Sequence, residues 1–226
     1  MSDNRFMEIE EITTPILIYI EGNIGCGKST IMQHYNNYKN VDILCEPIEL
    51  WENFHGSNLL ELQYKKQFNF LFQTTVYISR LEQMNKCSKS VRIMERSLYS
   101  SFEVFVEQSK TAMDKLEYEA LKYFFEVSRN GALDKITRPD LIIYLRTDSD
   151  VCFERMKHRN RTAEQSVSLD VLDNLNTAYD NWLLDGAKIP CPMLVLDGNL
   201  DKCDWTVQTN KINRTILEIP NIKANK

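Results

Sequence analysis

A chain of 226 residues with 43% hydrophobic side chains is long enough for one sizeable core and short for two. Its 27 lysines and arginines against 32 acids give a formal net charge of −5, which excludes a generally basic surface for nucleic acid or anionic membranes. No apolar run approaches a membrane span, and residues 1–14 lack the pattern of a signal or transit peptide. We expect one domain over residues 14–220, flexible tails at 1–13 and 221–226, and a cytoplasmic location with no membrane or nucleic-acid partner.

The six cysteines form no C-x-x-C pair, and no histidine lies near them at zinc-ligand spacing. We therefore expect free thiols rather than disulfides or a zinc site. This agrees with a reducing compartment.

The first apolar run, Ile16 to Ile20, predicts a strand that leads directly into a phosphate-binding loop. Glycines let such a loop turn its backbone N–H groups towards an anion at the start of the next helix, expected here from Ser29 to Tyr38. Lys28 would reach the β- and γ-phosphates, and Ser29 would hold magnesium. The segment that matches G-x-x-x-x-G-K-[ST] and opens the helix is Gly22-Asn23-Ile24-Gly25-Cys26-Gly27-Lys28-Ser29-Thr30.

The second apolar run, Val41 to Cys45, ends at Glu46, and Pro47 forces that acid into extended geometry at the edge of the sheet. A carboxylate there could orient an attacking hydroxyl and accept its proton during phosphoryl transfer. The alternative is a solvated acid at a strand end. Trp51 could wall a ligand pocket or belong to the core.

Residues 59–87 resemble one long helix, on which Gln73, Val76, Tyr77 and Arg80 share a face. The mixed polar and apolar face is unusual for a core. The amide of Gln73 offers both donors and an acceptor, so it could bind the edge of a nucleobase. Aromatic side chains that could stack on a base, or simply fill the core, are Trp51, Phe72 and Phe105.

The third apolar run, Val91 to Met94, is followed by Glu95, Arg96 and Ser97. An ion pair across the sheet edge is one interpretation of the acid and the arginine. In the other, Glu95 holds magnesium together with Ser29, while Arg96 fixes the hydroxyl or the transferred phosphoryl group.

The fourth apolar run, Leu141 to Leu145, precedes a segment in which Arg155 and Arg159 share a helical face and Arg161 follows. A solvated basic helix is the simple interpretation. Three guanidiniums within seven residues, in a chain with a phosphate loop, favour a lid that closes over a triphosphate. Glu164 could accept a hydrogen bond from a sugar hydroxyl.

A fifth apolar run, Met193 to Leu196, ends at Asp197, Gly198 and Asn199. Five strand-like runs separated by helical segments predict an α/β fold with a parallel sheet covered by helices on both faces. Ligands of such sheets bind beyond the carboxyl ends of the strands, where all these polar groups lie.

The motifs together resemble the deoxyribonucleoside kinases, the family of deoxycytidine, deoxyguanosine, mitochondrial thymidine and insect multisubstrate kinases. The match runs from about residue 16 to residue 199. It implies a P-loop kinase fold with an arginine-rich lid, ATP and Mg²⁺ as cofactors, a deoxynucleoside substrate and a homodimer. The segments that carry it are EGNIGCGKST, EPIELW, FQTTVYISR, MERSLYSSFEVFVE, LIIYLRT and ERMKHRNRTAEQ.

The resemblance implies that Glu46 is the general base for the 5′-hydroxyl and that Arg96 contacts the 5′ end. Lys28 completes the catalytic set, and Glu95 belongs to the magnesium shell with Ser29. The remaining ATP contacts are the loop from Gly22 to Thr30, the lid residues Arg155, Arg159 and Arg161, and Asp197, Gly198 and Asn199 near the adenine.

In the nucleoside site, the resemblance implies that Gln73 pairs with the base, that Phe105 stacks on it, and that Glu164 holds the 3′-hydroxyl together with a tyrosine. Tyr64 lies nearer to Gln73 than that tyrosine usually does, so either the helix begins later or another residue takes the role. The other predicted nucleoside contacts are Glu46, Trp51, Phe72, Val76, Arg80, Arg96 and Ser101.

Two further positions depart from the family pattern. Ala163 replaces one of two successive acids of the lid. Cys26 occupies a loop position that is usually small, and the surrounding N–H groups and Lys28 predict a thiol of raised reactivity.

Two other functions share parts of this pattern. A nucleoside monophosphate kinase has the loop and the lid, but Glu46 would repel its acceptor phosphate. A P-loop regulatory module that binds ATP without turnover has no use for a base-reading glutamine beside a catalytic acid.

The residues around the base predict a preference for pyrimidines. Family members that accept purines or cytosine commonly pair an arginine at the position of Arg80 with an aspartate at that of Ser101. Without that aspartate we expect Arg80 to swing away and leave room beside Val76 and Ser101 for a thymine methyl group. The triplet Phe105-Val106-Glu107 also resembles pyrimidine-preferring members, so we expect thymidine and deoxycytidine as substrates.

Overall fold

The computed structural model of the chain describes residues 15–185, 189, 191–200 and 205–224. Its centre is a five-stranded sheet with the order β2-β3-β1-β4-β5, in which every neighbouring pair is parallel. The strands are β1 (Ile16–Glu21), β2 (Val41–Leu44), β3 (Val91–Glu95), β4 (Leu141–Arg146) and β5 (Met193–Asp197).

All five predicted strands are confirmed, and each ends within one residue of its expected position. The central strand β1 is buried along its whole length, which explains its continuous apolar sequence. Its register aligns Ile18 with Ile93 of β3 and Leu141 of β4. The polar residues that end β1, β2 and β3 therefore meet at one edge of the sheet.

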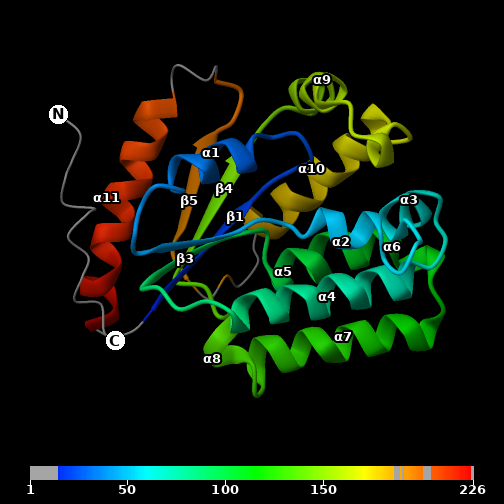
Figure 1. Cartoon of the computed structure of the whole chain (residues 1–226), viewed down its shortest axis with the longest axis horizontal. Coiled ribbons are helices and arrows are strands. Elements are labelled where there is room, and N and C mark those ends of the chain that lie inside the picture. Colours follow the sequence, from blue (N-terminus) through cyan, green and yellow to red (C-terminus); the bar gives the residue numbers. More distant parts are fainter. Residues whose placement is uncertain (1–14, 186–188, 190, 201–204, 225–226) are drawn as a thin grey trace.

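Helices cover both faces of the sheet, as predicted (Figure 1). Helices α1 and α11 pack together on one face, whereas α4, α7 and α10 lie on the other. The α-helices are α1 (Lys28–His34), α2 (Ile48–Glu52), α3 (Leu59–Tyr64), α4 (Asn69–Asn85), α5 (Leu98–Ser100), α6 (Glu107–Ser109), α7 (Lys115–Asn130), α8 (Asp134–Thr137), α9 (Ser149–Arg159), α10 (Leu169–Leu183) and α11 (Trp205–Ala224). A π-helix, η2 (Ser101–Val106), and two 3₁₀ turns, η3 (Lys110–Ala112) and η4 (Thr162–Glu164), complete the set.

The single helix predicted over residues 59–87 is wrong, because the chain breaks between α3 and α4. Lys66 and Phe68 both adopt left-handed backbone, with φ of 57° and 52°. The N–H of Gln67 donates to the carbonyl of Leu62 at 2.9 Å, a bond that spans six residues and closes the end of α3. Helices usually end this way on glycine, so a lysine at the left-handed position gave no signal in the sequence.

The ends of the predicted domain differ from the expectation on one side. Helix α11 continues to Ala224, so the expected tail from residue 221 begins inside a helix. Residues 1–13 and 225–226 lie outside the described part of the chain. Within that part no helix is long and apolar enough to cross a membrane. The five cysteines that it contains are free, and Cys203 lies outside it.

Glu21, the last residue of β1, is a fully buried acid. Its carboxylate accepts hydrogen bonds from Ser97 N at 2.8 Å and Ser97 Oγ at 2.5 Å, and from Tyr179 Oη at 3.4 Å. Burial raises the pKa of Glu21 above its ordinary value of 4.5, although the bonds from Ser97 and the charge of Arg96 act in the opposite direction. The folded state therefore holds this proton to a higher pH than the unfolded state does.

We expect Glu21→Gln to stabilise the fold at about pH 8, because an amide removes the cost of burying the charge and still accepts from Ser97. Since the folded pKa is raised, wild-type stability falls as pH rises above about 4.5, and the gain should shrink as pH is lowered towards that value. Urea unfolding of both proteins across this pH range measures the difference in their free energy of unfolding. The exposed Glu119→Gln is the control, and a variant less stable than wild type at pH 8 contradicts the prediction.

Candidate active site

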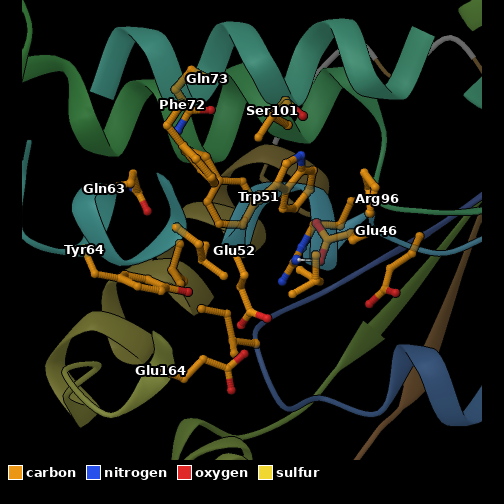
Figure 2. Close-up of a pocket in the computed structure, with 18 of the residues that line it drawn as sticks. Glu46, Trp51, Glu52, Gln63, Tyr64, Phe72, Gln73, Arg96, Ser101 and Glu164 are labelled. Carbon is orange, nitrogen blue, oxygen red and sulfur yellow. Dashed lines mark hydrogen bonds and ion pairs between the residues drawn. The ribbon is translucent and has the colours of Figure 1, made fainter. Parts of the chain in front are cut away.

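The carboxyl ends of β1, β2 and β3 open into one cavity of about 1120 Å³. Figure 2 shows side chains from several separate elements directed into it. Of the predicted site residues, the cavity brings together Ile24, Gly25, Lys28, Ser29, Glu46, Trp51, Tyr64, Phe72, Gln73, Val76, Arg80, Glu95, Arg96, Ser101, Phe105, Arg159, Arg161 and Glu164.

The loop between β1 and α1 has the geometry of a phosphate cradle. Gly25 and Gly27 have φ of 77° and 107°, a region open to glycine. A Cβ on Gly25 would lie 2.4 Å from the carbonyl oxygen of Cys152, so the close packing of the loop on α9 also requires glycine. The buried Lys28 Nζ donates to the carbonyls of Gly22 at 3.1 Å and Asn23 at 2.7 Å. This cradle fits the phosphates of ATP.

Cys26 does not present the accessible thiol that its position suggested. Its side chain is fully buried, and its Sγ lies beneath the loop within 3.7 Å of Lys28 Nζ. A Cβ added to Gly22 would approach that sulfur to 2.8 Å, which shows how tightly the loop closes over it. The expectation of a reactive thiol in the empty loop is wrong in this respect, because reagents need access to the sulfur.

Glu46 lies between two arginines at the edge of the cavity. Its Oε1 accepts from Arg80 Nη2 and its Oε2 from Arg96 Nη1, both at 2.6 Å, and its side chain is 12% exposed. Burial acts to raise the pKa of Glu46, but the charges of Arg96, Arg80 and Lys28 outweigh it and hold the pKa well below its ordinary value. Glu46 is thus an ionised, aligned carboxylate and not a solvated acid at a strand end.

Arg96 is held in place by contacts on every side. Its backbone is left-handed, with φ of 58°, which is uncommon for a residue with a Cβ. The guanidinium donates from Nε to Tyr179 Oη at 3.1 Å and from Nη2 to the carbonyl of Gly22 at 3.3 Å, and it lies 5.0 Å from the centre of the Phe105 ring. This places one positive charge between Glu46 and the phosphate loop.

Ser29 and Glu95 supply oxygen atoms suited to magnesium. Ser29 Oγ lies 3.4 Å from Glu95 Oε1 and 3.5 Å from Oε2, and Lys28 Nζ is 3.8 Å from Oε1. The described residues hold no group of three or more histidines, cysteines and acids that could bind a metal ion. One hydroxyl and one carboxylate fit Mg²⁺, because this ion takes its other ligands from water and phosphate.

The far end of the cavity has the composition expected of a base pocket. Gln73 is buried, and its Nε2 atom has no hydrogen-bond partner among the residues that the structure describes. Trp51 and Phe72 form an edge-to-face pair with ring centres 5.8 Å apart, and Trp51 Nε1 is satisfied by Ser79 Oγ at 3.2 Å. A buried amide N–H₂ without a partner, flanked by aromatic rings, calls for a polar planar ligand.

Two residues of α4 differ from the prediction. Tyr77 faces α7, where its hydroxyl contacts the carbonyl of Phe124 at 2.9 Å and Ser128 Oγ at 2.6 Å, so it takes no part in the cavity. Arg80 does not swing away for lack of an acid at position 101. It is 1% exposed and anchored on Glu46, so the room beside Ser101 is not created by its movement.

Tyr64 and Glu164 line the opposite side of the cavity from Gln73 (Figure 2). Burial, followed by the charge of Glu164, raises the pKa of Tyr64, so the two side chains are neighbours and Tyr64 keeps its proton. Glu164 accepts from Arg159 Nη2 at 2.7 Å with both oxygens and from Arg161 Nη1 at 3.0 Å. Helix α9 ends at Arg159, so Arg161 belongs to the turn that follows.

Arg155 does not join Arg159 and Arg161 in the cavity. Its guanidinium donates to the carbonyls of Gly198 at 2.7 Å, Leu200 at 3.2 Å and Cys26 at 3.3 Å. Prediction of a three-arginine lid is therefore wrong for Arg155, since backbone carbonyls occupy its donors. It connects the phosphate loop with the loop after β5.

The loop after β5 is fixed mainly by its own backbone. The N–H of Gly198 donates to the carbonyl of Arg146 at 2.7 Å, and that of Asn199 to Asp197 Oδ1 at 2.9 Å. Asn199 Oδ1 in turn accepts from the N–H of Asp148, also at 2.9 Å. Through Arg155, which donates to the carbonyls of both Cys26 and Gly198, this loop is connected to the phosphate loop.

A model of the family described as deoxynucleoside kinase matches residues 18–222 of the chain. The chain belongs to the deoxynucleoside kinase family. It is therefore an enzyme that phosphorylates deoxynucleosides with ATP, and neither a nucleoside monophosphate kinase nor a regulatory module.

Three relatives illustrate the breadth of the family. Human mitochondrial thymidine kinase 2 is 33% identical over 191 residues, 81% of this chain and 71% of the relative. A probable deoxycytidine kinase of fowlpox virus is 30% identical over 225 residues, 95% of this chain and 92% of the relative. The mitochondrial deoxyguanosine kinase of Xenopus laevis is 29% identical over 214 residues, 81% of this chain and 76% of the relative.

The structure adds residues to this kinase site that the sequence did not single out. Glu52 of α2 and Gln63 of α3 also line the cavity (Figure 2). Glu21 and Tyr179 support Arg96 from behind. Glu21 had a signal, because an acid that ends an otherwise apolar strand is unusual, whereas Tyr179 lies in a helix far along the chain and had none.

Proposed function

We propose that this kinase transfers the γ-phosphoryl group of ATP to the 5′-hydroxyl of a pyrimidine deoxyribonucleoside, with Glu46 as the base. The observation that carries the proposal is the position of Glu46, an ionised carboxylate between the phosphate loop and a pocket that contains an unpartnered amide on Gln73. A 5′-hydroxyl that donates to Glu46 would point its oxygen towards the loop.

In this proposal each side chain has one task. Glu46 aligns the 5′-hydroxyl and accepts its proton as the phosphoryl group moves, while Arg96 stabilises negative charge on that group. Lys28 binds the β- and γ-phosphates from the loop. Ser29 and Glu95 would hold Mg²⁺, which supplies charge neutralisation at the phosphates.

The nucleoside would lie across the cavity from Glu46 to Gln73. The free amide of Gln73 pairs with the base edge, and Phe105 and Phe72 enclose its faces. At the sugar, Tyr64 and Glu164 bind the 3′-hydroxyl. Arg159 and Arg161 close over the phosphates as a lid.

Incubation with labelled ATP and each of the four deoxynucleosides tests this proposal. The expected product is the 5′-monophosphate, identified by chromatography against the 3′ isomer. A 3′-monophosphate would contradict the alignment on Glu46, and hydrolysis of ATP without a phosphorylated nucleoside would contradict the nucleoside site.

We predict that kcat/KM is higher for thymidine or deoxycytidine than for either purine, because the short side chains of Val76 and Ser101 line the cavity and should leave space for a thymine methyl group. Two of the relatives are named for these pyrimidines. Ser101→Asp should raise purine use and lower thymidine use, since the new carboxylate fills that space. Steady-state kinetics give kcat/KM for all four deoxynucleosides and test this prediction. A wild-type preference for deoxyguanosine or deoxyadenosine contradicts it.

We also propose a homodimer that forms through α4 and α7. These helices pack side by side and expose apolar residues at i and i+7, namely Leu71 and Ile78 on α4, and Leu116 and Tyr123 on α7. We expect a dimer in sedimentation velocity and a shift to monomer in Ile78→Glu, with Lys86→Glu, directly after the end of α4, as the control. A monomeric wild type contradicts the proposal.

The cytoplasmic location and the absence of a nucleic-acid partner stay predictions from the sequence.

A further inference from the structure

Arg80 is a charged residue buried inside α4 whose hydrogen bonds lie at the catalytic end of the cavity, while its guanidinium also lies 5.8 Å from the centre of the Trp51 ring. Its Nη2 donates to Glu46 Oε1 at 2.6 Å. Its Nη1 donates to the carbonyl of Glu95 at 2.6 Å and to that of Arg96 at 3.0 Å. One guanidinium therefore contacts both the carboxylate of Glu46 and the backbone at the end of β3, where the turn with Arg96 begins.

These contacts use three of the five N–H donors of Arg80, both of Nη1 and one of Nη2. Its Nε is buried and has no hydrogen-bond partner among the described residues. Ser101, the neighbour expected to influence Arg80, directs its own hydroxyl to the carbonyl of Ser97 at 3.0 Å. Gln73 Nε2 likewise has no partner among the described residues, and Gln73 lines the base pocket.

Arg80 and Arg96 each bind one oxygen of the Glu46 carboxylate. Arg80 occupies Oε1 and Arg96 occupies Oε2 at equal distances, so the plane of the carboxylate is set by both. Each oxygen keeps a lone pair for a third partner. Rotation of the carboxylate away from the cavity would break two charge-assisted hydrogen bonds, which are the strong kind.

We propose that Arg80 is a positioning residue for the catalytic carboxylate and takes no part in base recognition. It acts through Glu46, which it orients, and through the carbonyls of Glu95 and Arg96, which it fixes behind the left-handed turn. The inference rests on the proposed role of Glu46 as the base. It assigns the nucleoside preference of this kinase to the other residues of the pocket.

A lysine cannot replace Arg80 in this role. The planar guanidinium presents two nitrogens in fixed directions, one to Glu46 and one to the backbone, whereas an ammonium is a single point of charge. Arg80→Lys keeps the charge and loses the fork. Arg80→Met keeps most of the length and loses both.

The test compares Arg80→Lys and Arg80→Met with Arg92→Lys. Arg92 lies on β3 and donates to the carbonyl of Cys87 at 3.3 Å, away from Glu46, so it is a matched control for a lost arginine–carbonyl contact. We expect kcat to fall about 10- to 100-fold in Arg80→Lys, with the KM for ATP and the ratio of thymidine to deoxycytidine use unchanged. Arg92→Lys should keep its kcat. If Arg80→Met does not fold, Arg80→Lys carries the test alone.

Two readouts separate positioning from general support of the fold. In the Glu46→Gln background, the loss of kcat caused by Arg80→Lys should be clearly smaller than in the wild type, because the carboxylate that Arg80 orients is gone. In Arg80→Met the acid limb of kcat/KM should move to higher pH, since the positive charge of Arg80 lowers the pKa of Glu46.

Other outcomes overturn the inference. Equal losses of kcat in both backgrounds show that Arg80 does not act through Glu46. A change of about tenfold or more in the thymidine to deoxycytidine ratio, with kcat retained, assigns Arg80 to base recognition. Full activity of Glu46→Gln alone overturns the proposed base, and this inference with it. A loss of kcat in Glu46→Gln, combined with equal losses from Arg80→Lys in both backgrounds, overturns this inference alone.

Discussion

Replacement of Glu46 by glutamine is expected to lower kcat by about 10²- to 10⁴-fold, the range typical for loss of a general base. The amide keeps the shape of the side chain, and its oxygen can still accept from Arg96 or Arg80. It cannot take the proton of the 5′-hydroxyl, and its N–H₂ group would face one of two arginine donors. The proposed ATP site is the loop, where Lys28 and the backbone are unchanged, so the affinity for ATP should be retained.

Steady-state kinetics and calorimetric titration with ATP check this expectation. Glu82→Gln is the matched control, because Glu82 lies on the outer side of α4 with a side chain that is 60% exposed. A loss of less than a few-fold in kcat removes Glu46 from the mechanism. Loss of ATP affinity together with kcat would instead indicate that the loop depends on Glu46.

The low pKa of Glu46 specifies what kind of base it is. The pKa of an efficient base lies near the working pH, and the arginines hold that of Glu46 well below its ordinary value of 4.5. Such a carboxylate would not remove the hydroxyl proton before the phosphoryl group arrives. In a loose transition state the attacking oxygen loses its proton late, and an ionised, aligned acceptor is then sufficient. The activity should therefore show no loss from Glu46 protonation between about pH 8 and pH 5.

The sequence was informative wherever a local rule applied. The five strands are buried apolar runs in a parallel sheet, and such runs are visible without knowledge of their partners. The phosphate loop follows a motif whose glycines have a backbone role, and the polar residues after each strand meet because parallel strands share one carboxyl edge. Glu46 and Glu95 were predicted in this way, whereas Gln73 was predicted from helical spacing within residues 59–87.

The sequence failed where partners are distant along the chain. Arg80 was expected to lack an anchor because the acid at position 101 is absent, yet it pairs with Glu46, which lies 34 positions earlier. Arg155 has the spacing of a lid residue, but the carbonyls of residues 198 and 200 take its donors. The break before α4 depends on left-handed backbone at Lys66 and Phe68, residue types that do not announce it.

The second large effect concerns Glu164, which we expect to couple the sugar of the nucleoside to the arginines of the lid. Its side chain is 5% exposed and accepts from Arg159 at 2.7 Å and from Arg161 at 3.0 Å. An ionised carboxylate has about four lone-pair sites, so a 3′-hydroxyl can donate to Glu164 while both arginines stay bound. The hydroxyl would steady the carboxylate and, through it, the two charges that face the phosphates of ATP.

Glu164→Gln should therefore lower kcat/KM for a 2′-deoxynucleoside by about 10- to 100-fold, the value of lost hydrogen bonds to a charged group. The variant should also lose the preference of the wild type for a 2′-deoxynucleoside over the matching 2′,3′-dideoxynucleoside.

In the wild type, a deoxynucleoside should tighten ATP binding more than its dideoxy analogue does, by a factor within the usual coupling range of about 5 to 150. Glu154→Gln, on the exposed side of α9, is the control. If Glu164→Gln keeps the preference for a 3′-hydroxyl, Glu164 does not contact the sugar. Equal ATP affinity with the two nucleosides would show that the contact exists without the coupling, because the arginines would then respond to the phosphates alone.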